Sequence, residues 1–182
     1  MTSDLKQMLR PMARDDPDGV RFNRIKLLAL DFDGVLTNGQ VIASSDGHEM
    51  VTCSHLDGQG IKDLRQIGVV VIVISGQRSA YVQHRCDKLE IWCSPPTDDK
   101  LTELKRVLER EEFCHINLDE VCFVGDDVGD LPVLETVGYP VAVANAIGKV
   151  RDSACHITRR FGGNGAVREI CDLIIRDKKR FG

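Results

Sequence analysis

The sequence predicts an α/β fold in which a parallel sheet carries helices on both faces. Short apolar runs rich in Val, Ile and Leu recur along the chain, and amphipathic segments separate them. Polar residues suited to chemistry follow three of these runs. In doubly wound domains of this kind, ligands bind beyond the carboxyl ends of the strands. We therefore expect a Rossmann-like sheet with a functional site at its carboxyl edge.

Length and composition fit a single folded domain. The chain has 182 residues, of which 42% are apolar and 29% charged, and its formal net charge is −4. These values are ordinary for a globular domain and give no indication of nucleic-acid binding. Residues 1–22 are rich in Asp, Arg and Pro and lack periodicity. We interpret 1–22 as a flexible N-terminal arm and 23–182 as the single domain.

Cysteine usage and hydropathy favour the cytoplasm. No apolar run approaches the roughly 18 residues needed to cross a bilayer, and residues 1–14 are charged rather than apolar. The seven cysteines form no Cys-x-x-Cys pair, and several stand inside apolar runs. This pattern indicates reduced, buried thiols rather than disulfides or a metal site. We expect a cytoplasmic protein with no membrane partner.

The first half of the domain reads as strands, a hairpin and two helices. Strands are expected at 27–30, 69–74 and 91–93, and a helix at 79–89. A helix capped by Asp57 carries Ile61, Leu64 and Ile67 and ends at Gly68. Between the first strand and this helix, two apolar runs flank Ser45-Asp46-Gly47, a turn signal. It predicts a β-hairpin over about residues 38–54.

The second half continues the alternation. A helix capped by Thr97 carries Leu101, Leu104 and Leu108. Strands are expected at 121–124 and 141–143, and helices at 131–137 and 166–175. The strands are separated by helices, which requires parallel pairing with crossover connections.

Carboxylates and other polar groups gather where three expected strands end. Asp31 and Asp33 follow the first strand and, being two residues apart, point the same way, while Gly34 permits a sharp turn. Ser75-Gly76-Gln77 follows the second strand, and Gly125-Asp126-Asp127-Val128-Gly129-Asp130 follows the strand at 121–124. Lys100 stands near a helix start between them. The same edge of the sheet should bring these groups together.

Taken singly, each of these features is ordinary. An Asp-x-Asp-Gly sequence is usually a turn, and a lysine near a helix start is usually a surface residue. The complete set, each member at an element end of one α/β pattern, favours a site. Clustered carboxylates repel one another unless a cation offsets their charge. Mg²⁺ prefers oxygen ligands, so the sequence predicts a magnesium site.

These residues resemble the four signature motifs of the haloacid dehalogenase superfamily: Asp31-x-Asp33-Gly34-x-x-Thr37, Ser75, Lys100 and Gly125-Asp126-Asp127-x-x-Asp130. Further segments resemble its subfamily of 3-deoxy-D-manno-octulosonate 8-phosphate phosphatases and related sugar-acid phosphatases: Thr37-Asn38-Gly39, Asp57-Gly58-x-Gly60-Ile61, Arg85 with Leu89, Leu131-Pro132-Val133 and Thr158–Glu169. The resemblance spans about residues 26–175. It implies a haloacid dehalogenase-like phosphatase that lacks a cap domain and carries the hairpin as a small flap.

The resemblance implies roles for the acidic residues. Asp31 would be the nucleophile and a Mg²⁺ ligand. Asp33 would act as general acid and then general base, and its backbone carbonyl would bind the metal. Asp126 would be the acidic metal ligand from the third strand end, and Asp127 and Asp130 would support these ligands.

Other residues would contact the substrate. Ser75 would hydrogen-bond a phosphoryl oxygen, and Lys100 would pair with the nucleophile and the phosphate. Gly76, Gln77 and Arg78 would lie beside the substrate. Relatives commonly have Thr-Gly-Arg where this chain has Ser-Gly-Gln, and Phe-Asn-x-Arg where it has residues 53–56. Both departures are expected near the mouth of the site, where the sugar acid is recognised.

A pair of arginines near the last helix offers a second anion contact. Arg159 and Arg160 precede the glycine-rich segment 162–165, and this arrangement favours binding of an anion such as a substrate carboxylate. The alternative from the residues alone is a turn with Asn164 as helix cap. Subfamily members are tetramers whose hairpins pack together and whose terminal segments reach neighbouring sites. The resemblance therefore implies a homotetramer.

Several functions stay open. The resemblance implies hydrolysis of a phosphorylated 2-keto sugar acid, with 3-deoxy-D-manno-octulosonate 8-phosphate, an intermediate of lipopolysaccharide biosynthesis, as first choice. A phosphatase of a sialic-acid-like nonulosonate 9-phosphate is one alternative. A non-catalytic assembly domain is another, although the intact motif carboxylates argue against it. A mutase or phosphotransferase would need a cap domain, and the stretch between Gly76 and Lys100 is too short for one.

Overall fold

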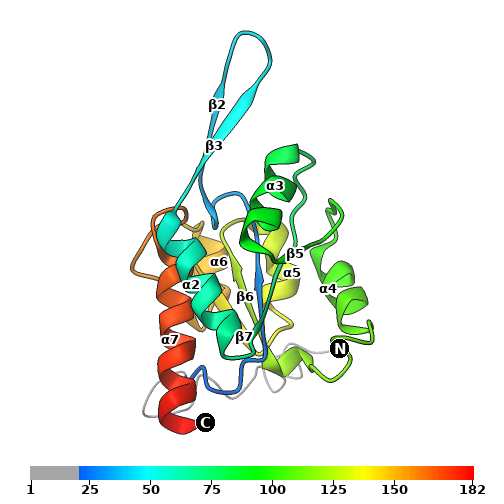
Figure 1. Ribbon diagram of the computed structural model, residues 1–182, viewed down its shortest axis with the longest axis vertical. Coiled ribbons are helices and arrows are strands. Elements are labelled where there is room, and N and C mark those ends of the chain that lie inside the picture. The colour runs from blue at the N-terminus through cyan, green and yellow to red at the C-terminus, as the bar shows by residue number, and fades with distance from the viewer. Residues whose placement is uncertain (1–20) are drawn as a thin grey trace.

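A computed structural model describes residues 21–182, and in it a parallel sheet stands between two layers of helices (Figure 1). The six strands of the main sheet have the order β5-β4-β1-β6-β7-β8, and every pair is parallel. Their bounds are β1 (Leu27–Leu30), β4 (Val70–Val73), β5 (Trp92–Cys93), β6 (Val121–Gly125), β7 (Tyr139–Ala142) and β8 (His156–Ile157). The predicted fold class is confirmed.

The strand order places the functional edge. From the central strand β1 the chain runs to β4 and β5 on one side, and then to β6, β7 and β8 on the other. Strands β4 and β6, which flank β1, therefore belong to the two halves of the sheet, and these halves extend in opposite directions from β1. This reversal is the topological switch point, beyond which ligands bind in open α/β sheets. The three strand ends that carry the sequence motifs meet there.

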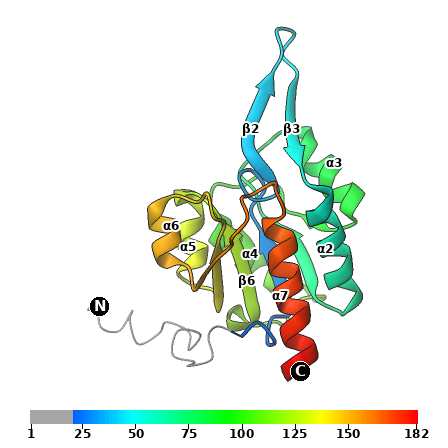
Figure 2. The same cartoon turned by 90° about the vertical axis from the view of Figure 1, so that its left-hand side faces the viewer.

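Helices cover both faces of the sheet. Figure 2 shows α2, α3 and α7 on one face and α5 and α6 on the other, and α4 packs against α5. Their bounds are α2 (His55–Gln66), α3 (Ala80–Leu89), α4 (Lys100–Leu108), α5 (Leu131–Leu134), α6 (Gly148–Ser153) and α7 (Ala166–Phe181), with short 3₁₀ turns η2 (Leu118–Glu120) and η3 (Val128–Asp130). All residues of β1 and β6 are buried, as two-sided cover requires.

Two helix caps differ from the sequence prediction. Ser54, not Asp57, caps α2, because its hydroxyl accepts the Leu56 N–H at 3.1 Å. Asp99, not Thr97, caps α4 by accepting the Thr102 N–H at 3.0 Å. In each case the sequence offers more than one residue of capping type within four positions. The path of the preceding loop decides between them.

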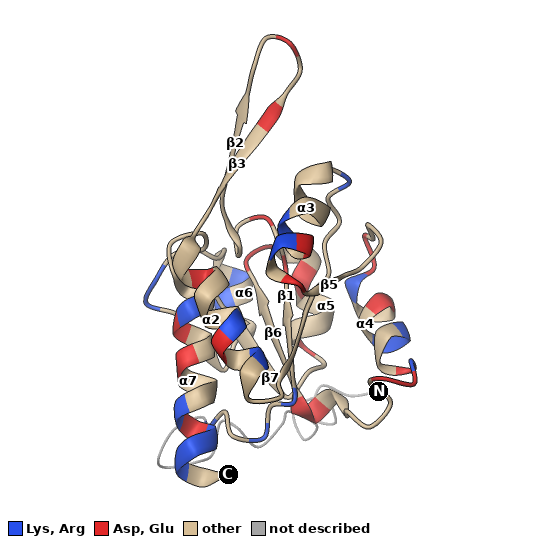
Figure 3. Cartoon of the chain, viewed as in Figure 1, with Lys and Arg blue, Asp and Glu red and all other residues tan. Residues whose placement is uncertain are grey.

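Some elements are longer, shorter or new. Helix α7 continues beyond residue 175 to Phe181, because charged residues at its exposed carboxyl end suit the helix dipole (Figure 3). Helix α5 ends at Leu134 rather than at residue 137, and β7 begins earlier than expected. Helix α6 and strand β8 were not predicted, because such short segments carry little periodicity.

The folded domain begins at or before Phe22. This residue was assigned to the arm, yet its side chain is 1% exposed and lies against the rings of Tyr139 and His156. Its N–H donates to the buried carboxylate of Asp177 in α7 at 2.9 Å. Residues 1–20, the rest of the expected arm, lie outside the described residues.

The predicted hairpin consists of β2 (Thr37–Ala43) and β3 (Glu49–Cys53) and projects away from the body of the domain (Figure 1). Gly47 adopts the left-handed conformation that the turn requires, with φ of 85°. Between Gly76 and Lys100 the chain forms only α3, β5 and their loops. The described chain therefore carries the hairpin flap and no cap domain.

The cysteines and the lengths of the helices bear on two expectations from the sequence. All seven cysteines are free, and Cys86, Cys122 and Cys171 are buried, whereas Cys114 is exposed. Across residues 21–182 no helix combines the length and apolar character that crossing a membrane requires.

Replacing Gly162 by alanine should destabilise the domain by about 1–3 kcal/mol, the usual range for overpacking. A Cβ at this position would collide with the carbonyl oxygen of Gly34. Gly148→Ala is the matched control, because its Cβ would meet no atom within 4 Å. Urea unfolding of both variants measures the difference, and equal midpoints would contradict this close packing.

Candidate active site

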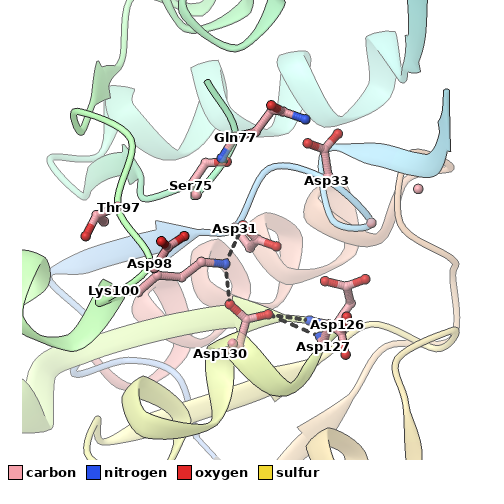
Figure 4. A pocket seen from close by; sticks show the side chains of 14 residues that line it. Asp31, Asp33, Ser75, Gln77, Thr97, Asp98, Lys100, Asp126, Asp127 and Asp130 are labelled. Carbon is pink, nitrogen blue, oxygen red and sulfur yellow. Dashed lines mark hydrogen bonds and ion pairs between the residues drawn. The ribbon is translucent and has the colours of Figure 1, made fainter. Parts of the chain in front are cut away.

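The expected site residues other than Arg78, Arg159 and Arg160 meet at the carboxyl edge of the sheet, where β1, β4 and β6 end (Figure 4). They line a pocket of about 480 Å³. Its lining consists of Asp31, Asp33, Gly34, Gly39, Ser75, Gly76, Gln77, Thr97, Asp98, Lys100, Asp126, Asp127, Gly129 and Asp130. Four segments far apart in the sequence thus contribute to one cavity, as the strand order demands.

Lys100 is the central cation of the pocket. It is the first residue of α4, and its side chain is 11% exposed. Its Nζ lies 2.7 Å from Asp31 Oδ1 and 2.7 Å from Asp130 Oδ1. Burial lowers the pKa of Lys100, but the two carboxylates raise it more, so the ammonium stays charged.

Asp130 holds the third loop in place. While its Oδ1 pairs with Lys100, its Oδ2 accepts the N–H groups of Asp126 and Asp127 at 2.9 and 3.2 Å. Asp127 in turn accepts the Val128 N–H at 2.7 Å, and its side chain is exposed. Both oxygens of Asp130 are therefore committed to the protein, and the loop after β6 presents Asp126 to the pocket.

Carboxylate oxygens of Asp31, Asp126 and Asp130 all lie within 4.8 Å of one another. Burial and the charge of Asp130 raise the pKa of Asp31 to about 8, against the attraction of Lys100. Burial and Asp130 also raise the pKa of Asp126 to about 6. The single ammonium does not balance this concentrated negative charge. Hard oxygen donors with excess negative charge fit Mg²⁺, and Asp31 and Asp126 are the side chains free to hold it.

Gly34 allows this cluster to form. Its φ is +85°, and a Cβ at this position would collide with the carboxylate of Asp126. The absence of a side chain lets Asp126 lie directly over the turn that follows Asp31. Glycine in the first motif therefore serves both the turn and the approach of the second carboxylate.

Asp33 lies at the wall of the pocket and is half-buried. Thr37 Oγ1 donates to its Oδ1 at 3.2 Å, and Tyr81 Oη lies 3.4 Å from its Oδ2. Burial raises the pKa of Asp33, and the hydrogen bonds from Thr37 and Tyr81 partly offset this shift. A carboxyl group with a raised pKa is suited to giving and taking protons.

The loop after β4 reaches the pocket only in part. Ser75 is buried, and its Oγ accepts the Gln77 N–H at 3.0 Å. Ser75, Gly76 and Gln77 line the pocket, as expected. Arg78 is exposed and is not among the lining residues. Its N–H donates to Gln77 Oε1 at 2.8 Å.

Arg159 and Arg160 are exposed and do not line the pocket of their own chain. Their backbone N–H groups donate to the carboxylate of Glu169 at 3.0–3.1 Å, so an internal anion already occupies these donors. The turn of the alternative interpretation is present, because the Asn164 N–H donates to the Phe161 carbonyl at 3.0 Å. Asn164 as the cap is wrong, because Gly165 is the N-cap residue of α7 and offers no side chain to cap it.

Some pocket residues were not predicted. Tyr81 contacts Asp33 from α3, and Thr97 and Asp98 line the pocket just before Lys100. Tyr81 follows the loop after β4 at the start of a helix, and this position was the available signal. Thr97 was interpreted as a helix cap, which obscured its place at the pocket.

The described geometry agrees with the relatives of this chain. A family model described as haloacid dehalogenase-like hydrolase matches residues 88–170. The chain is 38% identical over 152 residues to the 3-deoxy-D-manno-octulosonate 8-phosphate phosphatase KdsC of Escherichia coli strain K12. That match covers 83% of this chain and 79% of the relative.

Solved structures with the same fold include two at similar identity. One is a 3-deoxy-D-manno-octulosonate 8-phosphate phosphatase from Moraxella catarrhalis in complex with magnesium ion, phosphate ion and KDO, with TM-score 0.82, 37% identity and coverage of 88% of this chain and 91% of that chain. The other is a probable YrbI family phosphatase from Pseudomonas syringae, with TM-score 0.83, 39% identity and coverage of 99% and 94%.

The fold, the carboxylate cluster and these matches define a haloacid dehalogenase-like hydrolase. Within that superfamily, the chain belongs to the family of 3-deoxy-D-manno-octulosonate 8-phosphate phosphatases.

Mg²⁺ should stabilise the protein more at pH 8 than at pH 6. Without a cation, the raised pKa values of Asp31 and Asp126 make the folded state hold protons that the unfolded state has lost above pH 3.8. The metal-free protein therefore loses stability as the pH rises toward about 8. Mg²⁺ competes with these protons, and its apparent affinity should rise by up to about 1.4 kcal/mol per pH unit for each proton displaced.

Thermal melts with and without excess Mg²⁺ at the two pH values measure this effect. Asp126→Asn is the control and should lose most of the increment. An increment that is equal at pH 6 and pH 8 would contradict the metal assignment.

Proposed function

We propose that the protein is a Mg²⁺-dependent phosphatase that hydrolyses the phosphomonoester of a 2-keto sugar acid through a phosphorylated aspartate. The observation that carries the proposal is the ion pair of Lys100 with Asp31 at 2.7 Å inside the pocket. It holds one oxygen of a buried carboxylate in a fixed orientation beside Asp126, the other carboxylate that is free to hold a metal. This arrangement matches the needs of phosphoryl transfer, which depends on positioning and on offsetting negative charge.

In the first step, an Asp31 carboxylate oxygen attacks the phosphorus, and the bond from phosphorus to the sugar oxygen breaks. Asp33 gives its proton to the departing alkoxide, as its raised pKa allows. Ser75 donates to a phosphoryl oxygen, and Lys100 offsets the charge of the nucleophile and the transferred group. Asp31, Asp126 and the backbone carbonyl of Asp33 would hold Mg²⁺, which would supply the remaining positive charge when bound.

In the second step, a water molecule attacks the phosphorus of the aspartyl phosphate. Asp33, now deprotonated, takes a proton from that water, and the bond from phosphorus to Asp31 breaks to release inorganic phosphate. Asp130 keeps Lys100 and the Asp126 loop in register through both steps. Asp127 supports the same loop through the Val128 N–H.

Asp31→Asn should lower turnover by several orders of magnitude while the fold is kept, because the amide cannot serve as nucleophile. Turnover of p-nitrophenyl phosphate with Mg²⁺ measures this loss, and circular dichroism confirms the fold. Asp98→Asn, at the pocket mouth, is the matched control and should keep activity within a few-fold. Undiminished turnover in Asp31→Asn, or after chelation of Mg²⁺ in the wild type, would sink the mechanism.

The substrate proposed first is 3-deoxy-D-manno-octulosonate 8-phosphate, and a nonulosonate 9-phosphate is the second candidate. Support comes from the family and from a solved relative in complex with KDO and phosphate. Gln77 lines the pocket at a position where relatives commonly have arginine, so the pocket of this chain differs from theirs in charge at this position. Steady-state kinetics with octulosonate, nonulosonate and hexose phosphates test the choice. A clear preference for hexose phosphates would exclude both sugar acids.

The hairpin supports a homotetramer as the working form. Val41, Ile42 and Met50 are 48%, 57% and 57% exposed, and Ile42 pairs with Met50 across the strands. Neighbouring residues of a strand point to opposite faces, so the hairpin is apolar on both. It carries no Lys or Arg (Figure 3). A lone two-stranded hairpin with exposed apolar faces is marginal in water, which favours packing against further copies.

In such an assembly a neighbouring copy completes the substrate site. Around the pocket the cationic lining residue is Lys100, which is paired with two carboxylates, so the substrate carboxylate lacks a partner there. The exposed Arg159 and Arg160 of an adjacent subunit are the proposed partners. The cytoplasm is the proposed compartment, because seven free thiols suit a reducing environment.

Ile42→Lys combined with Met50→Lys should break the tetramer and raise KM for the sugar-acid phosphate about tenfold or more, since a charged pair contact of this kind contributes about 1.5–3 kcal/mol. KM for p-nitrophenyl phosphate should be spared, because that substrate has no carboxylate. Ser45→Lys with His48→Lys adds the same charge at the hairpin tip and serves as control. Sedimentation and kinetics report both effects, and a monomer with an unchanged sugar-acid KM would refute the shared site.

A further inference from the structure

Asp57 is a buried acidic residue for which the proposed mechanism has no use. It lies in the first turn of α2, and its side chain is 0% exposed. It is not one of the residues that line the pocket. Burying a carboxylate is costly unless hydrogen bonds compensate it. Its partners therefore indicate what it is for.

Both oxygens of Asp57 bind the start of α7. Oδ1 accepts the Arg168 N–H at 2.8 Å, and Oδ2 accepts the Gly165 N–H at 3.3 Å. Gly165 is the N-cap residue of α7 and offers no side chain of its own. Asp57 thus supplies, from another helix, the cap that α7 lacks, and its negative charge also suits the positive end of the helix dipole. Gly60 lets α2 approach closely enough, since a Cβ there would lie 3.0 Å from Arg168 Cα.

The segment that ends at this cap packs directly on the catalytic turn. Gly163 donates its N–H to the carbonyl of Val35 at 2.9 Å. A Cβ at Gly162 would collide with the Gly34 carbonyl, and one at Gly163 with the backbone of Asn38. The glycine-rich segment 162–165 is therefore a backbone brace for residues 34–38.

That turn controls Asp33. Thr37 Oγ1 donates to Asp33 Oδ1 at 3.2 Å and accepts the Gly34 N–H at 3.1 Å. The carboxyl group of Asp33 is thereby fixed by the same backbone on which segment 162–165 rests. The segment is anchored at its start by Asn145, whose Oδ1 accepts the Gly162 N–H at 2.8 Å, and at its end by Asp57. Just before the segment, Glu169 accepts the N–H groups of Arg159 and Arg160.

We infer that Asp57 is a positioning residue for the proposed acid–base group: it fixes segment 162–165, which fixes the 34–38 turn and thereby the carboxyl group of Asp33. This inference rests on the proposed function. Weakening the brace should harm the step that needs a proton donor more than it harms attack by Asp31, which Lys100 holds separately.

Leaving-group dependence separates these effects. Departure of an alkoxide needs the proton from Asp33, whereas p-nitrophenolate leaves without it. Asp57→Asn keeps the shape of the side chain but turns one acceptor into a donor that faces a backbone N–H. On kcat/KM, which reports the steps up to formation of the aspartyl phosphate, the loss for an alkyl phosphate such as glycerol phosphate should be at least about tenfold larger than the loss for p-nitrophenyl phosphate, a small part of the usual acid–base contribution.

Asp63→Asn is the matched control. Asp63 lies on the same helix and pairs with the side chain of Arg168 at 3.3 Å, but it does not bind the α7 backbone or the glycine-rich segment. It should change both kcat/KM values by the same small factor. Asn145→Ala releases the start of the segment from an exposed position and should reproduce the selective loss, which keeps the test decisive where Asp57→Asn does not fold.

Amide hydrogen exchange gives a readout that needs no substrate. Exchange in residues 34–38 should quicken in Asp57→Asn and not in Asp63→Asn. Equal losses on the alkyl and aryl phosphates, or unchanged exchange in the turn, would overturn the inference. A wild-type protein with no phosphatase activity would instead refute the proposed function, and the exchange result would still decide whether Asp57 braces the turn.

Discussion

A buried ammonium between two carboxylates is the constraint on which the rest of the site depends. Lys100 lies 2.7 Å from both Asp31 and Asp130, and the side chains are 11%, 9% and 1% exposed. An unpaired charge at this depth would be strongly unfavourable, so the three groups are placed together or not at all. Because Asp130 also holds the backbone of Asp126 and Asp127, the same cation aligns the loops after β1 and β6.

The sheet topology makes this meeting possible. Strand β1 lies between β4 and β6, and all three run in the same direction, so their carboxyl ends share one edge. Lys100 arrives from the start of α4, where the chain returns from β5 to cover the other face. After Lys100 has paired with Asp31 and Asp130, the net charge of the cluster is still negative, which suits a divalent cation. The hairpin projects away from the body of the domain and does not close the pocket as a cap domain would.

The residues at strand ends could be predicted because a strand end is a local feature. Asp31, Ser75 and Asp126 each follow a buried apolar run, and the parallel pattern places such positions at one edge. The partner that a side chain finds on a distant segment could not be predicted from a local pattern: Tyr81 reaches Asp33 across 48 residues, and Asp57 reaches Gly165 across 108. Asp57 even carried a false signal, because an acidic residue near a helix start resembles the cap of its own helix.

The arginines show a second kind of limit. Arg159 and Arg160 beside glycines at a helix start have the composition of an anion site, yet Glu169 of the same helix occupies their backbone donors. The residue types predicted an anion at this segment, and the anion that the backbone donors bind is the carboxylate of Glu169 from the same chain. The glycines proved to serve close backbone packing on the catalytic turn.

We propose that Asp31 carries the phosphoryl group. The most direct test of this proposal uses Asp33→Asn with p-nitrophenyl phosphate and Mg²⁺, because this variant can form the aspartyl phosphate but lacks the base that hydrolyses it. Acid quench, borohydride reduction and peptide mass mapping then locate the modified residue. If Asp31 is the nucleophile, Asp31 alone is converted to homoserine. Reduction at another aspartate, or release of p-nitrophenol with no reducible acyl phosphate, would contradict it.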